Sequence, residues 1–248
     1  MKKILLIGET CKDIFEYGNC KRLSPEAPVP VFLSSYKIEN EGMAGNVMAN
    51  LESLGLEVYF ITNPEMVVKR RYIEEESNNH LLRIDEDPKI KRIKIPEIDF
   101  LKYDALVISD YNKGFLSKKD ISDLISKHPL SFLDSKKPLG KWCKGASFIK
   151  INEKEYSMVK GRKVEKFLNL IVTLGGKGCI YHGQRFPVQK VQVRDVSGAG
   201  DTFLASFVKS YLENKNIAKS LNYANTCARL VVSKRGVSTI NSSEVQLE

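Results

Sequence analysis

Short apolar runs alternate along the chain with longer segments in which apolar residues recur every three or four positions. The short runs predict buried strands at residues 3–8, 58–62, 105–109, 131–133, 148–151, 168–174, 179–182 and 188–193. The longer segments predict helices at residues 45–56, 118–126, 202–212 and 217–233. Strands that alternate with helices indicate an α/β fold around a mostly parallel sheet, which binds ligands at the carboxyl ends of its strands.

Two stretches do not follow this alternation. Residues 14–35 carry three prolines and alternating apolar residues, a pattern typical of an extended, hairpin-like excursion from the main sheet. Residues 67–85 are predicted to form two extended segments around the polar turn at 77–79. Both stretches are therefore expected to be extended rather than helical.

Composition and charge exclude several classes of protein. The chain has 248 residues, of which 42% are hydrophobic and 28% charged, as is usual for a soluble globular protein with a sizeable core. The net charge of +9 comes from dispersed lysines without an interleaved aromatic platform, so we expect no binding to nucleic acid. Five cysteines without a C-x-x-C pair favour reduced thiols and a cytoplasmic protein. The apolar run at 4–7 is too short for a signal peptide or a membrane span, so no membrane is expected.

The most informative motif is the octapeptide D-V-S-G-A-G-D-T at residues 195–202, which leads into a predicted helix. Gly198 and Gly200 permit the sharp turn and close backbone approach that this junction requires. The unpaired N–H groups and the positive dipole end of the helix make a cradle for an anion such as phosphate. Asp201 adds a proton acceptor there, as phosphoryl transfer to a hydroxyl requires. The alternative is a glycine turn with Asp201 as a helix cap.

The octapeptide resembles the C-terminal signature of the ribokinase family, the PfkB-type carbohydrate kinases. Residues 24–31 resemble more specifically the members that phosphorylate a heptose 7-phosphate. The other matching segments follow in order along the chain: Gly8-Glu9 with Asp13 and Tyr17-Gly18, Gly42-x-Ala44-Gly45-Asn46-Val47, Ser109-Asp110-Tyr111-x-Lys113-Gly114, Leu133-Asp134-x-Lys136, Asn152-x-x-Glu155, Val172-Thr173-Leu174-Gly175 with Gly178, Tyr223-Ala224-Asn225 and Gly236-Val237-Ser238-Thr239. The resemblance implies one ribokinase-like three-layer α/β sandwich domain over residues 1–248, with a small β lid from about 14–35 and 67–85.

The resemblance also implies an activity, the ATP-dependent transfer of the γ-phosphate to a hydroxyl of a sugar or sugar phosphate. Asp201 would be the general base, and three backbone N–H groups would hold the transferring group, those of Gly198, Ala199 and Gly200. Four residues would border the nucleotide: Thr173, Gly175, Gly178 and Asn225. For Asn225, which lies on a predicted helix, a purely structural role is the alternative.

The same resemblance suggests two cation sites. Asn152 and Glu155 lie one helical turn apart and would orient water around the Mg²⁺ that accompanies the phosphates. Their alternative is an exposed helix start, with Asn152 as the cap and Glu155 completing a capping box. Asp195 and Val196 would contribute to a monovalent-cation site, for example for K⁺.

The sugar is expected to contact Asp13 and Asn46 beside the turn at Gly42, because a polyol needs fixed donors and acceptors. The alternative for Asp13 is a loop aspartate that satisfies its own backbone. Three cations are candidates for binding a phosphate already carried by the sugar, with a charged β surface as the alternative: Lys69, Arg71 and Arg83.

Two features depart from the family pattern. Gly42 is followed by Met43 where the family has a second glycine, so the side chain there would reshape the sugar pocket. The path from Thr62 to Val67 is shorter than in family members. These departures leave a PfkB-type kinase for another sugar, or a catalytically weak sugar- or nucleotide-binding homologue, as alternatives. Exposed edges of the lid predict a homodimer.

Overall fold

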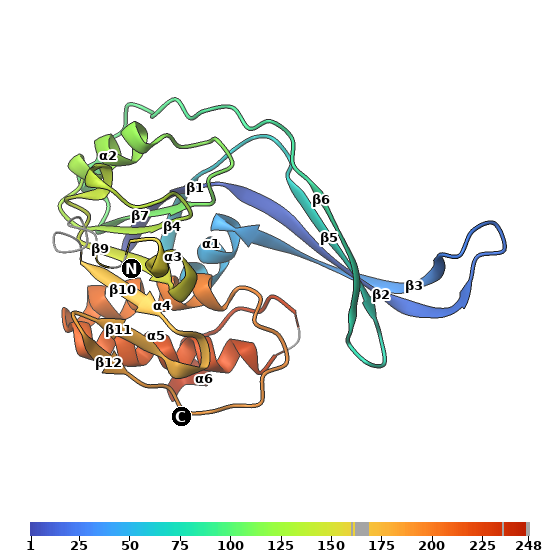
Figure 1. Cartoon of the computed structure of the whole chain (residues 1–248). Coiled ribbons are helices and arrows are strands. Elements are labelled where there is room, and N and C mark those ends of the chain that lie inside the picture. Colours follow the sequence, from blue (N-terminus) through green and yellow to red (C-terminus); the bar gives the residue numbers. More distant parts are fainter. Residues whose placement is uncertain (160, 162–168, 235, 247–248) are drawn as a thin grey trace.

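The larger of two β-sheets forms the centre of the molecule (Figure 1). The structure is a computed structural model that describes residues 1–159, 161, 169–234 and 236–246. Eight strands lie in the order β12-β11-β10-β9-β8-β7-β1-β4, and neighbours from β4 to β10 are parallel. Their bounds are β1 Lys3–Gly8, β4 Glu57–Ile61, β7 Ala105–Asp110, β8 Ser131–Ser135, β9 Phe148–Asn152, β10 Leu170–Thr173, β11 Cys179–Tyr181 and β12 Gln184–Phe186.

Helices cover both faces of this sheet, because successive side chains of its buried strands point to opposite sides. Ile4 and Leu6 of β1 belong to one apolar cluster with α1, α4 and α5, whereas Leu5 and Ile7 belong to a second cluster with α2. The expected three-layer arrangement is therefore present. The helix bounds are α1 Ala44–Ser53, α2 Lys118–Ser126, α3 Glu153–Ser157, α4 Ala199–Asn214, α5 Ile217–Val232 and α6 Ser242–Gln246, with 3-10 turns η1 Phe100–Lys102, η2 Lys141–Cys143 and η4 Gly175–Lys177. None of the described helices combines the length and apolarity needed to cross a bilayer.

The second sheet, which we call the lid sheet, extends away from this body as a long twisted arm (Figure 1). It contains β2 Thr10–Leu23, β3 Pro30–Met43, β5 Val68–Glu74 and β6 His80–Glu86 in the order β3-β2-β5-β6. The β2–β5 pair is parallel and the two outer pairs are antiparallel. The two extended stretches predicted from sequence form this sheet, although its first hairpin is longer than the predicted range of 14–35.

The strand predicted at residues 188–193 is wrong. The chain instead makes a tight hairpin between β11 and β12, with His182 and Gly183 at positive φ angles of 46° and 78°. Two successive residues with positive φ suit the twist of a hairpin. Pro187 follows β12 directly, and its missing N–H group cannot continue the ladder. The apolar residues after it line a cleft instead.

The short path between β4 and the lid sheet is closed by one buried side chain. Asn63 accepts a hydrogen bond at Oδ1 from the Thr10 backbone N–H at 2.8 Å. Its Nδ2 donates to the Glu65 carbonyl at 2.6 Å. No helix lies between Thr62 and Val67, and the amide of Asn63 satisfies the backbone groups of the turn in its place.

Candidate active site

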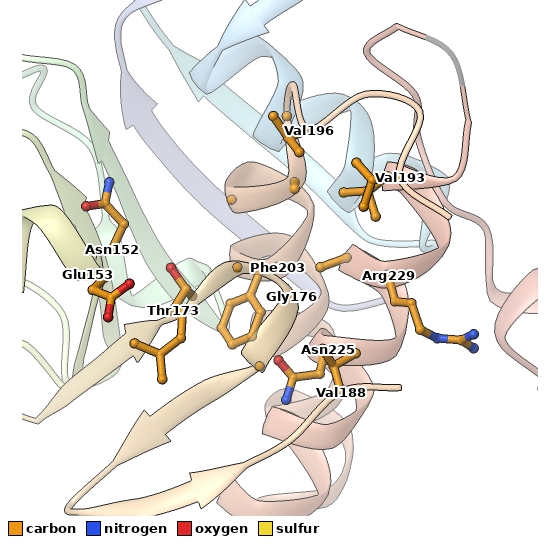
Figure 2. A pocket seen from close by; sticks show the side chains of 18 of the residues that line it. Asn152, Glu153, Thr173, Gly176, Val188, Val193, Val196, Phe203, Asn225 and Arg229 are labelled. Atoms are coloured by element: carbon orange, nitrogen blue, oxygen red, sulfur yellow. The ribbon is translucent and has the colours of Figure 1, made fainter. Parts of the chain in front are cut away.

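A cleft of about 800 Å³ opens where β9 and β10 end and α4 begins. This is the edge at which open α/β sheets bind ligands. In Figure 2, Asn152 and Thr173 lie on one side of the cleft, Val193 and Arg229 on the other, and the ring of Phe203 between them. The cleft therefore joins strand ends, the segment after β12 and helix α5 around the start of α4.

Residues 198–200 form what we call the anion cradle at the start of α4. Gly198 is the N-cap, with φ at 79°, and a Cβ there would lie 2.5 Å from Nδ2 of Asn46. Glycine is therefore required at this position both by conformation and by space. Within the described chain, the backbone N–H groups of Gly198 and Gly200 have no protein acceptor, whereas the N–H of Ala199, also expected to hold the transferring group, donates to the Val196 carbonyl at 3.3 Å. The cradle thus presents free donors at the positive end of a 16-residue helix.

Asp201 is the third residue of α4 and is only 7% exposed. Its Oδ1 accepts from the hydroxyl of Tyr111 at 2.7 Å, and its Oδ2 accepts from Nδ2 of Asn46 at 2.9 Å. Because both oxygens bond to other elements and Gly198 holds the N-cap, the carboxylate does not cap the helix. Burial raises the pKa of Asp201 above its ordinary value, although Tyr111 and the Lys150 ammonium oppose this. A buried carboxylate with a raised pKa suits proton acceptance near neutral pH.

Two of the expected sugar contacts, Gly42 and Asp13, lie against each other. A Cβ on Gly42 would overlap the carboxylate of Asp13, so this glycine lets Asp13 lie against the turn. Asp13 does not bond its own backbone but pairs with Arg71, with 2.6 Å between Oδ1 and a guanidinium nitrogen. Asn46, near the start of α1, is hydrogen-bonded to Asp201.

Met43 stands where the family has a second glycine, and its side chain does not lie where the sequence led us to expect. It adopts a positive φ of 58° and is the N-cap of α1. Its side chain is 3% exposed and belongs to the apolar cluster beneath the sheet, together with Leu5 and Ile7. The substitution therefore adds to the core while the backbone keeps the conformation that glycine favours.

The three candidate phosphate-binding cations differ in their neighbours. Arg71 is neutralised by Asp13 and stacks on the ring of Phe15. Arg83 makes two hydrogen bonds to Asp85, and its side chain is half exposed. Lys69 is half-buried and, in the part of the chain that is described, forms no ion pair. Of the three, Lys69 is thus the cation left for an anionic ligand.

Four lysines without a predicted role also line the cleft: Lys136, Lys150, Lys154 and Lys190. Lys150 is buried, with its Nζ 2.6 Å from Oδ2 of Asp134. A Cβ on Gly200 would lie 2.9 Å from this Nζ, which places the ammonium group against the anion cradle. Lys136 pairs with Glu155 at 2.7 Å. The signal for Lys150 was a lone charge within the apolar strand 148–152.

Asn152 and Glu155 form the capping box considered as the alternative to a metal role. Oδ1 of Asn152 accepts from the Glu155 N–H, and Oε2 of Glu155 accepts from the Asn152 N–H, both at 2.9 Å. Asn152 lines the cleft, whereas Glu155 is not among its lining residues and pairs with Lys136, which is. Each carboxylate oxygen can accept a further bond, so the pair fits a hydrated Mg²⁺ through water rather than directly.

The four predicted nucleotide contacts, Thr173, Gly175, Gly178 and Asn225, all line the cleft. Gly175 and Gly178 have positive φ angles of 56° and 85°, which open the turn after β10. Asn225 donates from Nδ2 to the Phe186 carbonyl at 2.9 Å, the structural bond that was its alternative role. Asp195, the candidate cation ligand, accepts from the Ser197 N–H at 2.8 Å and so closes a local turn.

Comparison with known proteins identifies the family. A family model described as pfkB family carbohydrate kinase matches residues 98–244. The chain therefore belongs to the pfkB family of carbohydrate kinases, phosphotransferases that act on an alcohol group of their acceptor. Two solved structures share its fold: the ribokinase of Thermotoga maritima (TM-score 0.74, 18% identity, 100% of this chain and 99% of that chain) and the ribokinase of Arabidopsis thaliana complexed with ribose and ATP (TM-score 0.76, 16% identity, 99% and 98%).

Curated relatives resemble the chain more closely in sequence. It is 31% identical to the bifunctional protein HldE of a Nitratiruptor species over 299 aligned positions, and 31% identical to that of Helicobacter pylori (strain J99) over 309. These alignments cover 98% and 100% of this chain but only 64% and 66% of the two relatives. The chain thus spans less than two thirds of their length. Both alignments are also longer than its 248 residues, so the relatives contain segments that it lacks.

Proposed function

We propose that this chain transfers the γ-phosphate of ATP to a hydroxyl of a sugar or sugar phosphate, with a heptose 7-phosphate as the acceptor that fits best. One observation supports the proposal most directly. A buried carboxylate, Asp201, lies one residue from an anion cradle with free N–H groups, and it is hydrogen-bonded to Asn46, one of the expected sugar contacts. A proton acceptor and an anion site in one cleft are the two parts that phosphoryl transfer needs.

In the proposed reaction, the acceptor hydroxyl donates its proton to Asp201 while its oxygen attacks the γ-phosphorus. The new O–P bond forms as the bond from phosphorus to the β,γ-bridging oxygen breaks, and ADP leaves with that electron pair. The N–H groups of Gly198 and Gly200, together with the Lys150 ammonium, would stabilise the negative charge on the transferring group. Asn46 and Tyr111 hold the base in place.

Two cations would assist the proposed reaction. Mg²⁺ would neutralise charge on the phosphates, held through water by Asn152 and Glu155. A monovalent cation such as K⁺ would bind near Asp195 and Val196, and the related fold of phosphofructokinase-2 from Escherichia coli was solved in complex with potassium. At 15% identity, that likeness concerns the fold alone.

The choice of a phosphorylated acceptor rests on Lys69. This half-buried cation comes from β5 of the lid sheet, and its Nζ lies 5.5 Å from the centroid of the Tyr111 ring, next to the proposed base. A cation at this place that forms no ion pair among the described residues favours an acceptor that already carries a phosphate. A different sugar, or binding with weak turnover, is the alternative favoured by the missing segment between Thr62 and Val67.

A coupled assay of ADP release over a panel of sugars tests the proposed function. The panel comprises heptose, hexose and pentose phosphates, each with its unphosphorylated counterpart. We expect release that depends on a sugar phosphate, and a Lys69→Gln variant that raises the KM for that phosphate more than for the free sugar. If thermal shifts show that ATP and a sugar bind but the assay shows no turnover, the weakly active homologue is favoured instead.

We also propose a homodimer that pairs through the lid sheet. Strands β3 and β6 are its edges, and they carry six apolar residues exposed by 41–55%: Leu33, Tyr36, Ile38, Leu81, Leu82 and Ile84. Unpaired edges and exposed apolar side chains favour pairing with a second copy. Light scattering is expected to give twice the mass of the 28.1 kDa chain, and a monomer mass at micromolar concentration would contradict the proposal.

A further inference from the structure

We propose that Tyr111 is a positioning residue for the base: its hydroxyl fixes the Asp201 carboxylate, and the buried Glu9 fixes the loop that carries Tyr111. The inference rests on the proposed function for the role of Asp201. The hydrogen bond between Tyr111 and Asp201 joins residues 90 positions apart. It links the loop after β7 to the first turn of α4, which carries the base.

Asp201 accepts hydrogen bonds from two donors and can still accept a third hydrogen bond. Tyr111 bonds Oδ1 and Asn46 bonds Oδ2, one hydrogen bond for each oxygen. A carboxylate has about four lone-pair sites, so each oxygen keeps room for the proton of a sugar hydroxyl. Donors from two separate elements restrict rotation of the carboxylate, and a fixed base needs no reorientation during the reaction.

The carboxylate of Glu9 binds the backbone of the loop that carries Tyr111. This residue is fully buried after β1, and its carboxylate accepts from the Tyr111 N–H at 2.8 Å and from the Lys113 N–H at 2.9 Å. Asn112 between them has a positive φ of 58°, so the loop turns sharply around the carboxylate. Burial, and then the neighbouring Asp110, raises the pKa of Glu9. A buried carboxylate whose two oxygens both bond the loop backbone determines where the Tyr111 side chain lies.

The ring of Tyr111 has contacts of its own, which allow the hydroxyl to be tested separately. The ammonium groups of Lys69 and Lys136 lie 5.5 Å and 5.6 Å from its centroid. Phenylalanine keeps a ring for both cations and removes only the bond to Asp201. Tyr111→Phe is therefore the sharpest single change.

The pH dependence of stability gives a readout that needs no turnover. Four charged or titratable groups face Asp201: Tyr111, Lys136 and Asp134 from the ends of β7 and β8, and Lys150 from β9. Burial raises the pKa of Asp201, so the free energy of unfolding falls as pH rises from the ordinary pKa of an aspartate to the native one. The Tyr111 bond lowers the pKa of Asp201, so its loss makes this fall larger.

Urea unfolding of the wild type, Tyr111→Phe, Asp201→Asn and the double variant at about pH 4 and about pH 8 tests the inference. In the wild-type background we expect Tyr111→Phe to destabilise the protein more at the higher pH, as a roughly tenfold gain in the proton affinity of Asp201 requires. In the Asp201→Asn background the effect should not change with pH. The exposed Tyr59 provides a control, Tyr59→Phe, with no pH-dependent effect. An equal pH dependence in both backgrounds, or none in either, overturns the inference whether or not the protein turns over a sugar.

A second arm uses the active enzyme. Tyr111→Phe is expected to raise the acid midpoint of the kcat/KM profile by about one pH unit, with ATP affinity unchanged. Glu9→Gln can accept only one of the two loop N–H bonds, so it should move the midpoint in the same direction by a smaller amount. A midpoint that neither variant moves would show that the loop supports structure only.

Discussion

The Asp201→Asn variant is expected to lose catalysis while it keeps, or gains, stability. Asparagine has the shape of aspartate but cannot accept a proton from the sugar hydroxyl, so kcat should fall by roughly 10²–10⁴-fold. The raised pKa of Asp201 means that its ionised form costs stability above that pKa, and asparagine removes this cost. Steady-state kinetics and urea unfolding at neutral pH measure the two effects on the same preparation.

Retained ATP binding is the necessary control for this variant. A thermal shift on adding ATP should match that of the wild type, because the nucleotide side of the cleft is unchanged. Full activity in Asp201→Asn would exclude Asp201 as the base. A loss of stability at neutral pH would instead mean that the hydrogen bonds from Tyr111 and Asn46 outweigh the burial of the charge.

The Lys150→Met variant is expected to destabilise the fold by about 3 kcal/mol or more. Asp134 is 2% exposed, and burial alone would raise its pKa, but the charges of Lys150 and Lys136 lower it. Without Lys150, the buried carboxylate keeps only Lys136, whose Nζ lies 3.6 Å away. Removing one partner of a buried ion pair leaves a charge without its counterion, which costs more than the pair itself contributes. Chemical denaturation measures the loss.

Two further variants test the cause of that loss. Lys150→Met combined with Asp134→Asn should recover part of the stability, because no unpaired charge remains, but it should not restore charge stabilisation at the anion cradle. Lys119→Met removes an exposed i,i+4 pair with Asp123 and should cost only about 0.3–0.5 kcal/mol. If Lys150→Met cost no more than Lys119→Met, the ion pair would be exposed in solution rather than buried.

Local pattern was sufficient to predict most of the main sheet and its helices. The helix at residues 118–126 begins and ends as predicted, since Ser117 and Asp120 form a capping box before an apolar stripe. The octapeptide likewise predicted a glycine turn into α4, because its signal is contained in eight consecutive residues. The apolar run at 188–193 has the pattern of a strand but forms none, because its side chains line the cleft rather than a sheet.

The parts of the site that were not predicted from the sequence depend on contacts between distant segments. Tyr111 and Asp201 are 90 residues apart, and nothing near either residue indicates the other. The sequence shows Lys150 only as a charge in an apolar strand, and its position against the cradle depends on how β9 meets α4. Met43 looked like an obstruction to the sugar, but the positive φ that it adopts sends its side chain into the core.

A structure with a non-hydrolysable ATP analogue and the sugar phosphate would test the central claim most directly. We expect the γ-phosphate against the N–H groups of Gly198 and Gly200, and the acceptor hydroxyl within about 2.6–3.2 Å of an Asp201 oxygen. The acceptor oxygen should lie about 3–3.5 Å from the γ-phosphorus. A γ-phosphate bound away from the start of α4, or a sugar hydroxyl out of reach of Asp201, would contradict it.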